Sequence, residues 1–344
     1  MTIRLNQVSD ILPIDAFWDR GDIEVTEIID GLVHKTYLVR VDDEQFILQR
    51  INTYVFKEAD KVISNIQVVT AHLEQDPAFR LQVPTLKRSI HGDLAFEAAD
   101  GSLWRCFHYI EGYTRETLSH VQEAFEVAHA FGEFSASLSS LPPSKLHFTI
   151  VGFHDPALRQ SQFAEALKFG LVNRIQACET EISKIEAFKY IAHDMAGLNI
   201  PLKVAHNDAK LSNVLFDFEG HPLSVIDLDT VMPGSPLHDF GDLVRSMASS
   251  VREDHDQTRE VFLNRSIFDA LEMGFLEGTC QTLTTKESQH LKLGAAYIIF
   301  EQAMRFLSDY LFGDIYYRIK AHDHNLIRAR NQIALLESFI SQIG

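Results

Sequence analysis

The stretch VAHNDAKLSNVLFDFEGHPLSVIDLD, residues 204–229, decides the fold of this chain. An apolar run leads into Asp208, and Asn213 follows five residues later. Two short strand-like runs then flank a Gly-His-Pro turn, and the second of them ends at Asp227. Two carboxylates and one amide therefore lie in loops at the ends of short buried strands. Such groups are costly near an apolar core unless they are paired or hold a metal.

This ordered set of polar side chains suits phosphoryl transfer, in which the protein mainly holds a metal on the phosphates and places the acceptor hydroxyl. Asp227 and Asn213 would hold Mg²⁺ through their oxygen atoms. Asp208 would accept or orient the proton of the acceptor hydroxyl, and the ring of His206 would hold the loop. The alternative is a buried polar network that only braces loops. The spacing His-x-Asp-x₄-Asn, a hairpin and a further Asp is far more specific than a lone aspartate and favours catalysis.

Composition limits the class of protein. The chain has 344 residues, 46% of them hydrophobic, which is enough for a large core and about two lobes. A net charge of −17 argues against nucleic acid or an anionic membrane as partner. The three cysteines are odd in number and far apart, so they predict neither a disulfide framework nor a zinc site, and we expect reduced thiols in a cytoplasm. We see no signal peptide and no apolar run of membrane-spanning length.

The order of patterns predicts an α+β fold with two lobes. Residues 1–110 read as a β-rich lobe with one helix, and residues 111–344 as a mainly helical lobe that contains the catalytic loop. The β-lobe should form an antiparallel meander, because strand-like runs alternate with turn signals. A helix start is expected within residues 1–22. Helical spacing further predicts helices at residues 56–73, 121–141, 156–170, 175–195, 239–250, 259–276, 285–312 and 326–343.

The strings HNDAKLSN and VIDLD resemble those of the aminoglycoside phosphotransferase and choline kinase superfamily, which is related to protein kinases. The β-lobe, connector and helical lobe follow the order expected for that two-lobed fold. By position, the resemblance implies that Asp208 is the catalytic aspartate, Asn213 a metal ligand and Asp227 the metal-binding aspartate. Asp229 lies where relatives also tend to carry an acid, either as a supporting partner or as a second metal ligand.

Longer strings are similar to the N-acetylhexosamine 1-kinase group. They are VIDLDTVMPGSPLHDFGDLVR, MRFLSDYLFGDIYY and ILQRINTYVFK. The resemblance implies an enzyme that uses ATP and Mg²⁺ to phosphorylate the anomeric hydroxyl of N-acetylglucosamine or N-acetylgalactosamine.

The nucleotide site departs from the kinase pattern. The loop expected to cover the phosphates has one glycine, Gly31, where kinases have several. The position of the phosphate-binding lysine falls at Gln49 or Arg50, and only Arg50 can supply charge if its side chain turns to the cleft. The connector that would receive adenine contributes the backbone of three residues in sequence, His108, Tyr109 and Ile110.

The acceptor site is expected on a late segment with polar and aromatic residues, namely Arg305, Asp309, Tyr316 and Tyr317. Arg305 and Asp309 are four apart on a helix and share a face, so a surface ion pair is the alternative. Asp239 opens a helix and either caps it or contacts the substrate, with capping preferred.

Three functions compete at this stage. The first is an N-acetylhexosamine 1-kinase that works as a monomer on a small-molecule sugar and a nucleotide. The second is a kinase of the same superfamily that acts on choline, ethanolamine, homoserine or an aminoglycoside, and the acidic surface would suit cationic acceptors. The third is a nucleotide-binding pseudokinase, which the combination of Asp208, Asn213 and Asp227 argues against.

Overall fold

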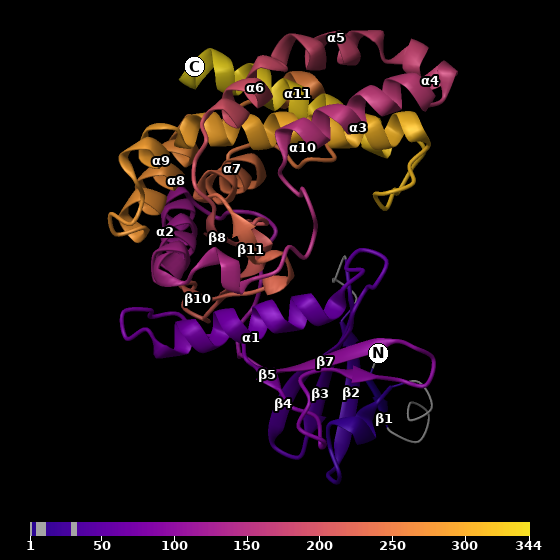
Figure 1. The fold of residues 1–344 in the computed structure, drawn as a ribbon, viewed down its shortest axis with the longest axis vertical. Coiled ribbons are helices and arrows are strands. Elements are labelled where there is room, and N and C mark those ends of the chain that lie inside the picture. The colour runs from indigo at the N-terminus through magenta and orange to yellow at the C-terminus, as the bar shows by residue number, and fades with distance from the viewer. Residues whose placement is uncertain (1, 5–11, 29–32) are drawn as a thin grey trace. The chain divides into compact units, whose positions relative to one another are not determined.

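A computed structural model describes residues 2–4, 12–28 and 33–344 (Figure 1). The chain divides into two compact units. The first unit comprises residues 1–113, 141–150 and 215–232, and the second comprises residues 114–140, 151–214 and 233–344. The predicted border near residue 110 lies close to the first division, but two later segments also pack with the N-terminal residues. Residues 204–229 are therefore divided, with residues 204–214 in the second unit and residues 215–229 in the first.

The first unit is built on an antiparallel sheet (Figure 1). The strands are β1 (Thr2–Arg4), β2 (Ile23–Ile28), β3 (Lys35–Val41), β4 (Glu44–Arg50), β7 (Leu103–His108) and β5 (Leu86–Lys87), in that spatial order, and β6 (Phe96–Glu97) also pairs with β7. Short turns such as Asp42-Asp43 join neighbouring strands, which fixes the meander that the alternating pattern predicts.

The two faces of this sheet differ in character. Side chains alternate along each strand, so every second residue shares a face. On one face, Leu48 and Trp104 join a buried apolar cluster that also contains Trp18. On the other face, Gln49 is paired in register with Arg105 on β7 and with Thr36 on β3. A polar row therefore crosses three strands opposite the apolar cluster.

A buried asparagine ties the later segments to the first unit. Asn65 lies on α1 (Ala59–Gln75) and is almost fully enclosed. Its amide nitrogen donates to the carbonyl oxygens of His147 (2.8 Å) and Val231 (3.0 Å), and its oxygen accepts from the His147 N–H (2.9 Å). A sequence reading cannot see these contacts, because they join residues more than 80 positions apart. The hairpin of β9 (Val214–Phe216) and β10 (Pro222–Val225) follows the catalytic loop.

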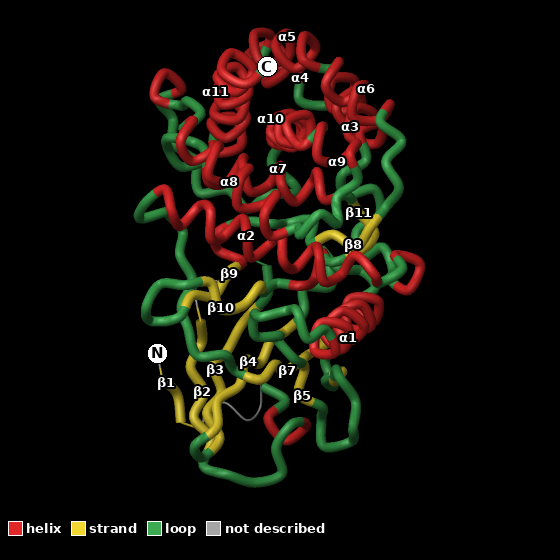
Figure 2. Tube along the Cα trace, turned by 90° about the vertical axis from the view of Figure 1, so that its left-hand side faces the viewer, coloured by secondary structure: helices red, strands yellow, loops and turns green. Residues whose placement is uncertain are grey.

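The second unit is mainly helical. Its helices are α2 (Val121–Ser137), α3 (Pro156–Phe169), α4 (Val172–Ala177), α5 (Glu179–Phe188), α6 (Tyr190–Gly197), α7 (Pro236–Met247), α8 (Arg265–Gly278), α9 (Thr285–Gln289), α10 (Leu291–Phe312) and α11 (His324–Ile343). Figure 2 views α10 nearly end-on, with α3, α7 and α11 around it. α10 is apolar on most of its circumference, as expected for a central helix. The predicted α+β fold class is confirmed.

Three predicted helix boundaries differ from the structure for local reasons. The helix expected at residues 259–276 begins only at Arg265, because the Asn264 side chain accepts from the Ile267 N–H and caps it there. The helix expected at 285–312 is interrupted at His290, and the one expected at 175–195 is divided into α4, α5 and α6. Of the helix start expected within residues 1–22, the described part shows only a 3₁₀ turn at Ile14–Ala16, and residues 5–11 lie outside the described residues.

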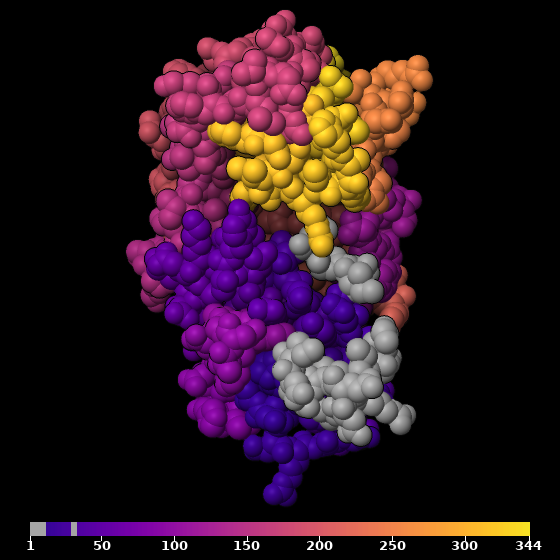
Figure 3. Space-filling view, turned by 90° about the vertical axis from the view of Figure 1, so that its right-hand side faces the viewer, coloured from indigo at the N-terminus to yellow at the C-terminus, as the bar shows by residue number. Residues whose placement is uncertain are grey.

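In Figure 3, the yellow surface of the C-terminal part of the chain lies beside the pink surface of an earlier segment of the same unit. The ion pair of Lys184 with Glu337 links α5 to α11. Inside the unit, α2 and α8 cross at glycines: a Cβ on Gly274 would stand 2.2 Å from the Phe125 carbonyl oxygen. Only a glycine allows that approach. Among the described residues, no helix combines the length and apolar character needed to cross a membrane.

Candidate active site

The catalytic loop follows β8 (Lys203–Ala205) and holds its two predicted residues together. The amide nitrogen of Asn213 donates to the backbone oxygen of Asp208 (2.9 Å) and to its Oδ2 (3.1 Å). Both N–H groups of this amide are thereby used, which leaves its oxygen as the atom suited to a metal. Asn213 is buried, whereas the side chain of Asp208 keeps about a quarter of its surface exposed (26%). The structure thus places these two side chains in contact within one loop.

Lys210 is a partner of Asp208 that the sequence reading missed. Its Nζ lies 2.7 Å from Asp208 Oδ2. Burial alone would raise the pKa of Asp208, but the Lys210 ammonium, together with His206 and Arg245, lowers the pKa below the ordinary value. The carboxylate is thus ionised at neutral pH. The described contacts use Oδ2, so Oδ1 is the oxygen suited to an acceptor hydroxyl.

Asp239 holds the two backbone N–H groups that directly precede Asp208. It lies in the first turn of α7, whose cap is Ser235, so the predicted capping role belongs to the serine. The two Asp239 oxygens accept the N–H groups of His206 (2.9 Å) and Asn207 (2.6 Å). Burial raises the pKa of Asp239 to about 7, although the two N–H donors act in the opposite direction. Asn207 itself adopts φ = +61°, a strained conformation for a residue with a side chain.

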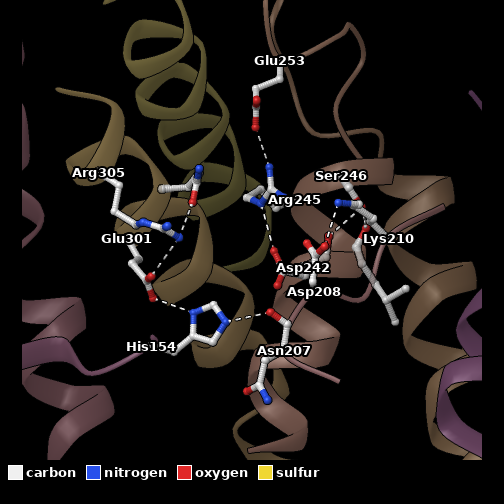
Figure 4. Close-up of polar contacts among 12 residues, drawn as sticks. His154, Asn207, Asp208, Lys210, Asp242, Arg245, Ser246, Glu253, Glu301 and Arg305 are labelled. Carbon is white, nitrogen blue, oxygen red and sulfur yellow. Dashed lines mark hydrogen bonds and ion pairs between the residues drawn. The ribbon is translucent and has the colours of Figure 1, made fainter. Parts of the chain in front are cut away.

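His154 holds the same loop from its other side (Figure 4). It directly precedes Asp155, the N-cap of α3. Its Nε2 lies 3.1 Å from the Asn207 carbonyl oxygen, and its Nδ1 lies 3.0 Å from Glu301 Oε2 on α10. The peptide groups on both sides of Asn207 are therefore fixed by ionisable side chains.

Arg305, a predicted acceptor residue, projects from α10 into an aromatic enclosure. Its guanidinium carbon lies 5.1, 5.9 and 5.6 Å from the ring centres of Phe153, Tyr316 and Tyr317. Its Nη1 is 3.7 Å from Glu301 Oε1, one turn earlier on the helix. Arg305 thus pairs along the helix with Glu301 and not with Asp309, which has other partners. The side chain of Arg305 is only 12% exposed.

Asp309 organises the loop that carries the two predicted tyrosines. Its Oδ1 accepts the N–H groups of Ile315 (3.0 Å) and Tyr316 (2.7 Å). Its Oδ2 accepts the Tyr317 N–H (2.9 Å) and the Asn325 amide (2.9 Å). A buried carboxylate with four donors is satisfied by the protein, so these contacts assign Asp309 a positioning role. The surface ion pair considered as the alternative is not what the structure shows for this residue.

A chain of alternating charges, also missed from the sequence, extends from α7 (Figure 4). Arg245 Nε lies 3.1 Å from Asp242 Oδ1, and its Nη1 lies 2.6 Å from Glu253 Oε2. Arg328 pairs with the other oxygen of Glu253, at 2.8 Å from its Nε. In the sequence, only the i,i+3 spacing of Asp242 and Arg245 on one helix indicated that an ion pair could form here.

In the first unit, Asp227 and Asp229 lie in a turn held by a buried ion pair. Asp227 adopts φ = +61°, and Asp229 is 1% exposed. Arg105 Nη1 and Nη2 donate to the two oxygens of Asp229 at 2.5 and 3.0 Å, and His34 Nε2 lies 2.6 Å from its Oδ2. Burial alone would raise the pKa of Asp229, but Arg105 lowers it well below its usual range. These partners favour a supporting role for Asp229 over metal binding.

Arg105 occupies the place where a phosphate-binding lysine was expected. Gln49 Oε1 accepts from Arg105 Nε (3.0 Å) and Nη2 (2.8 Å). Arg50, the predicted cation, shares the opposite face of the sheet with Leu48, is half-exposed and contacts Asp100 at 3.4 Å. The strand alternation foreseen in the sequence thus separates Arg50 from the polar row.

The connector residues continue β7. The His108 N–H donates to the Thr85 carbonyl (3.0 Å), and the Tyr109 N–H donates to the Gln45 carbonyl (3.2 Å). Contacts of these two residues with adenine would therefore use their carbonyl oxygens, and Ile110 lies just beyond the strand. Gly31, the expected loop glycine, lies outside the described residues.

Comparison with known proteins decides the family. Residues 24–276, well over half of the chain, match the model of a phosphotransferase enzyme family. The chain belongs to this family. The match includes Asp208, Asn213, Asp227, Asp229 and Arg105, whereas Glu301, Arg305 and Asp309 lie beyond it.

Solved structures share the fold at low sequence identity. Amicoumacin kinase hAmiN, in complex with AMP-PNP, Ca²⁺ and Ami, has a TM-score of 0.65 at 13% identity, with 96% of this chain and 94% of that chain covered. A microcompartment-associated aminopropanol kinase has 0.65 at 16% identity, with 92% and 93% covered. Choline kinase from Cryptosporidium parvum Iowa II has 0.56 at 13% identity, with 98% and 94% covered. These likenesses show that the phosphotransferase shares its fold with these kinases.

Proposed function

We propose that this phosphotransferase transfers the γ-phosphoryl group of ATP to the anomeric hydroxyl of an N-acetylhexosamine, N-acetylglucosamine or N-acetylgalactosamine, and yields the sugar 1-phosphate. Asp208 would orient the hydroxyl and accept its proton, because its carboxylate is ionised and its side chain is 26% exposed. Two fixed peptide groups beside it supply the rigidity that in-line attack needs.

The enclosed guanidinium of Arg305 is the feature that favours a neutral sugar as the acceptor. Three aromatic rings already surround this cation, and Glu301 lies beside it. A quaternary ammonium or aminoglycoside amine placed there would meet a like charge with little solvent between them. A neutral sugar with hydroxyl and acetamide oxygens fits a guanidinium donor and aromatic walls. Tyr316 and Tyr317 would provide those walls, with Asp309 holding their loop.

The donor set suits magnesium. Asn213 offers an amide oxygen whose nitrogen is already engaged with Asp208, and Asp227 offers a carboxylate in a strained turn. These are the hard oxygen ligands that Mg²⁺ prefers. When bound, Mg²⁺ would neutralise charge on the phosphates of ATP. We propose Asn213 and Asp227 as its protein ligands.

For the nucleotide, we propose Arg105 in place of the missing lysine. Its guanidinium reaches the Gln49 position from the neighbouring strand and also holds Asp229, two residues after Asp227. The charge that a lysine would supply then comes from β7. The backbone at His108, Tyr109 and Ile110 is proposed to receive the adenine, as the sequence predicts, and Gly31 to belong to the loop over the phosphates.

The test is an acceptor panel in a coupled assay of ADP release. We expect turnover with the two N-acetylhexosamines and little with choline, ethanolamine, homoserine or an aminoglycoside. Phosphorus NMR of the product should show phosphate on the anomeric oxygen. Turnover confined to an amino alcohol or an aminoglycoside would overturn the choice of acceptor, and binding of ATP without turnover on any acceptor would support a pseudokinase.

The second candidate is a kinase for a cationic acceptor. Its support is the net charge of −17, which would attract an amine to the surface. Salt separates the two candidates, because only a cationic acceptor should show a KM that rises steeply with ionic strength.

A further inference from the structure

His154 faces a hydrogen-bond acceptor with each of its ring nitrogens. The backbone oxygen of Asn207 can only accept, and it lies 3.1 Å from Nε2. The Glu301 carboxylate lies 3.0 Å from Nδ1. A neutral imidazole has one N–H and can satisfy only one of these two groups. With both nitrogens donating, the ring is an imidazolium.

The charges around Glu301 show that it is an ionised acceptor and not a protonated donor. Three cationic groups face its carboxylate: His154, Arg159 at 3.4 Å and Arg305 at 3.7 Å. Burial alone would raise the pKa of Glu301, but these cations outweigh it and lower the pKa. Burial would likewise lower the pKa of His154, and Glu301 reverses this and raises the pKa above the usual 6.5.

The other titratable groups that face His154 come from three helices. Arg159 lies on α3, His238, Asp239 and Asp242 lie on α7, and Tyr297, Glu301 and Arg305 lie on α10. The ring of His238 is 4.8 Å from that of His154, centre to centre, and burial lowers the pKa of His238 to about 3. His238 is therefore neutral, so the positive charge of the pair resides on His154.

We propose that His154 is a positioning residue which, as an imidazolium, ties the Asn207 carbonyl beside Asp208 to Glu301 and through Glu301 to Arg305. The proposal rests on the proposed function, in which Asp208 receives the acceptor proton and Arg305 contacts the acceptor. One continuous chain of contacts then joins the acceptor side of α10 to the catalytic loop (Figure 4).

Two consequences follow from this chain of contacts. Loss of the proton from His154 removes one donor, so the hydrogen bond to either the Asn207 carbonyl or Glu301 is lost at a buried site. The position of Asp208 then becomes less well defined, so kcat falls while the affinity for ATP stays unchanged. Because Glu301 also holds Arg305, the loss should weaken acceptor binding as well.

The test compares His154→Gln with His238→Gln, a matched change at the adjacent buried histidine. The glutamine can donate to one acceptor but cannot titrate. For wild type we expect kcat to fall on the alkaline side as His154 loses its proton. His154→Gln should lower kcat about tenfold to a hundredfold at pH 7 and remove that alkaline fall, whereas His238→Gln should keep it. An alkaline fall that persists in His154→Gln, or a kcat within about twofold of wild type, would overturn the proposal.

A second measurement uses the wild-type protein, so it requires neither a folded variant nor kinase turnover. Neutron diffraction of deuterium-exchanged crystals at pH 7 should show a deuteron on both Nδ1 and Nε2 of His154. A single deuteron would overturn the proposal. If both are present but no acceptor is phosphorylated, the proposed function fails while the doubly donating His154 stands.

Discussion

The buried pair of Arg105 and Asp229 allows a quantitative test of what holds the turn at Asp227. Both side chains are 2% exposed, and the guanidinium meets the carboxylate through two of its nitrogens. Arg105→Met leaves the Asp229 charge buried with His34 as its remaining side-chain partner. Removing one partner of a buried pair costs about 3–5 kcal/mol. We therefore expect the free energy of unfolding to fall by that amount.

The measurement can be confined to the first unit. Both tryptophans of the chain, Trp18 and Trp104, lie in the apolar cluster behind this sheet. Their fluorescence in a urea titration reports the unfolding of that unit. The control is Arg50→Met on the adjacent strand, whose partner Asp100 is exposed, and it should cost less than about 1 kcal/mol.

A double variant separates the interaction from the loss of packing. Arg105→Met with Asp229→Asn removes the buried charge and keeps an acceptor for His34, so it should recover most of the loss. The reasoning would be refuted if Arg105→Met cost no more than Arg50→Met, or if the double variant were less stable than the single one.

Further predictions concern the second unit. Gly274→Ala should destabilise it by roughly 1–3 kcal/mol, since the new Cβ meets the Phe125 carbonyl at 2.2 Å, whereas Gly197→Ala, with open space around it, should be neutral or slightly stabilising in thermal unfolding. Because the pKa of His154 is raised in the folded state, protonated His154 contributes fully to the free energy of unfolding below pH 6.5. This contribution is lost as pH rises through the folded pKa. Urea titrations followed by circular dichroism should show the loss in wild type and not in His154→Gln. Arg305→Lys should lower kcat/KM for the acceptor about tenfold or more without changing the Kd of ATP, because lysine lacks the planar fork, and equal losses for both substrates would contradict this role.

Local sequence patterns were sufficient to predict the helices and strands and the site residues that lie close together in the sequence. Alternating strands and turn signals predicted the antiparallel sheet, and the five-residue spacing placed Asn213 beside Asp208. The same alternation placed Gln49 and Arg50 on opposite faces. Helix boundaries failed where a cap or a break intervened, as at Asn264, because capping competes with periodicity over only a few residues.

The supporting partners of the site could not be predicted, because they join distant parts of the chain. His154 meets Asn207 across 53 residues, and Arg105 meets Asp229 across 124. No periodic pattern relates such positions, and each residue alone reads as an ordinary polar side chain. Tertiary packing decides which of the 31 basic side chains becomes buried and therefore needs a partner.

The most direct test of the account is the turnover of Asp208→Asn with ATP and N-acetylglucosamine, measured together with the Kd of ATP. The control is Asp217→Asn, a change at a partly exposed aspartate in the turn of the following hairpin. The account predicts that Asp208→Asn lowers kcat about 10²- to 10⁴-fold at unchanged Kd, while Asp217→Asn stays near wild type. A kcat within about threefold of wild type would show that Asp208 is not the residue that receives the acceptor proton.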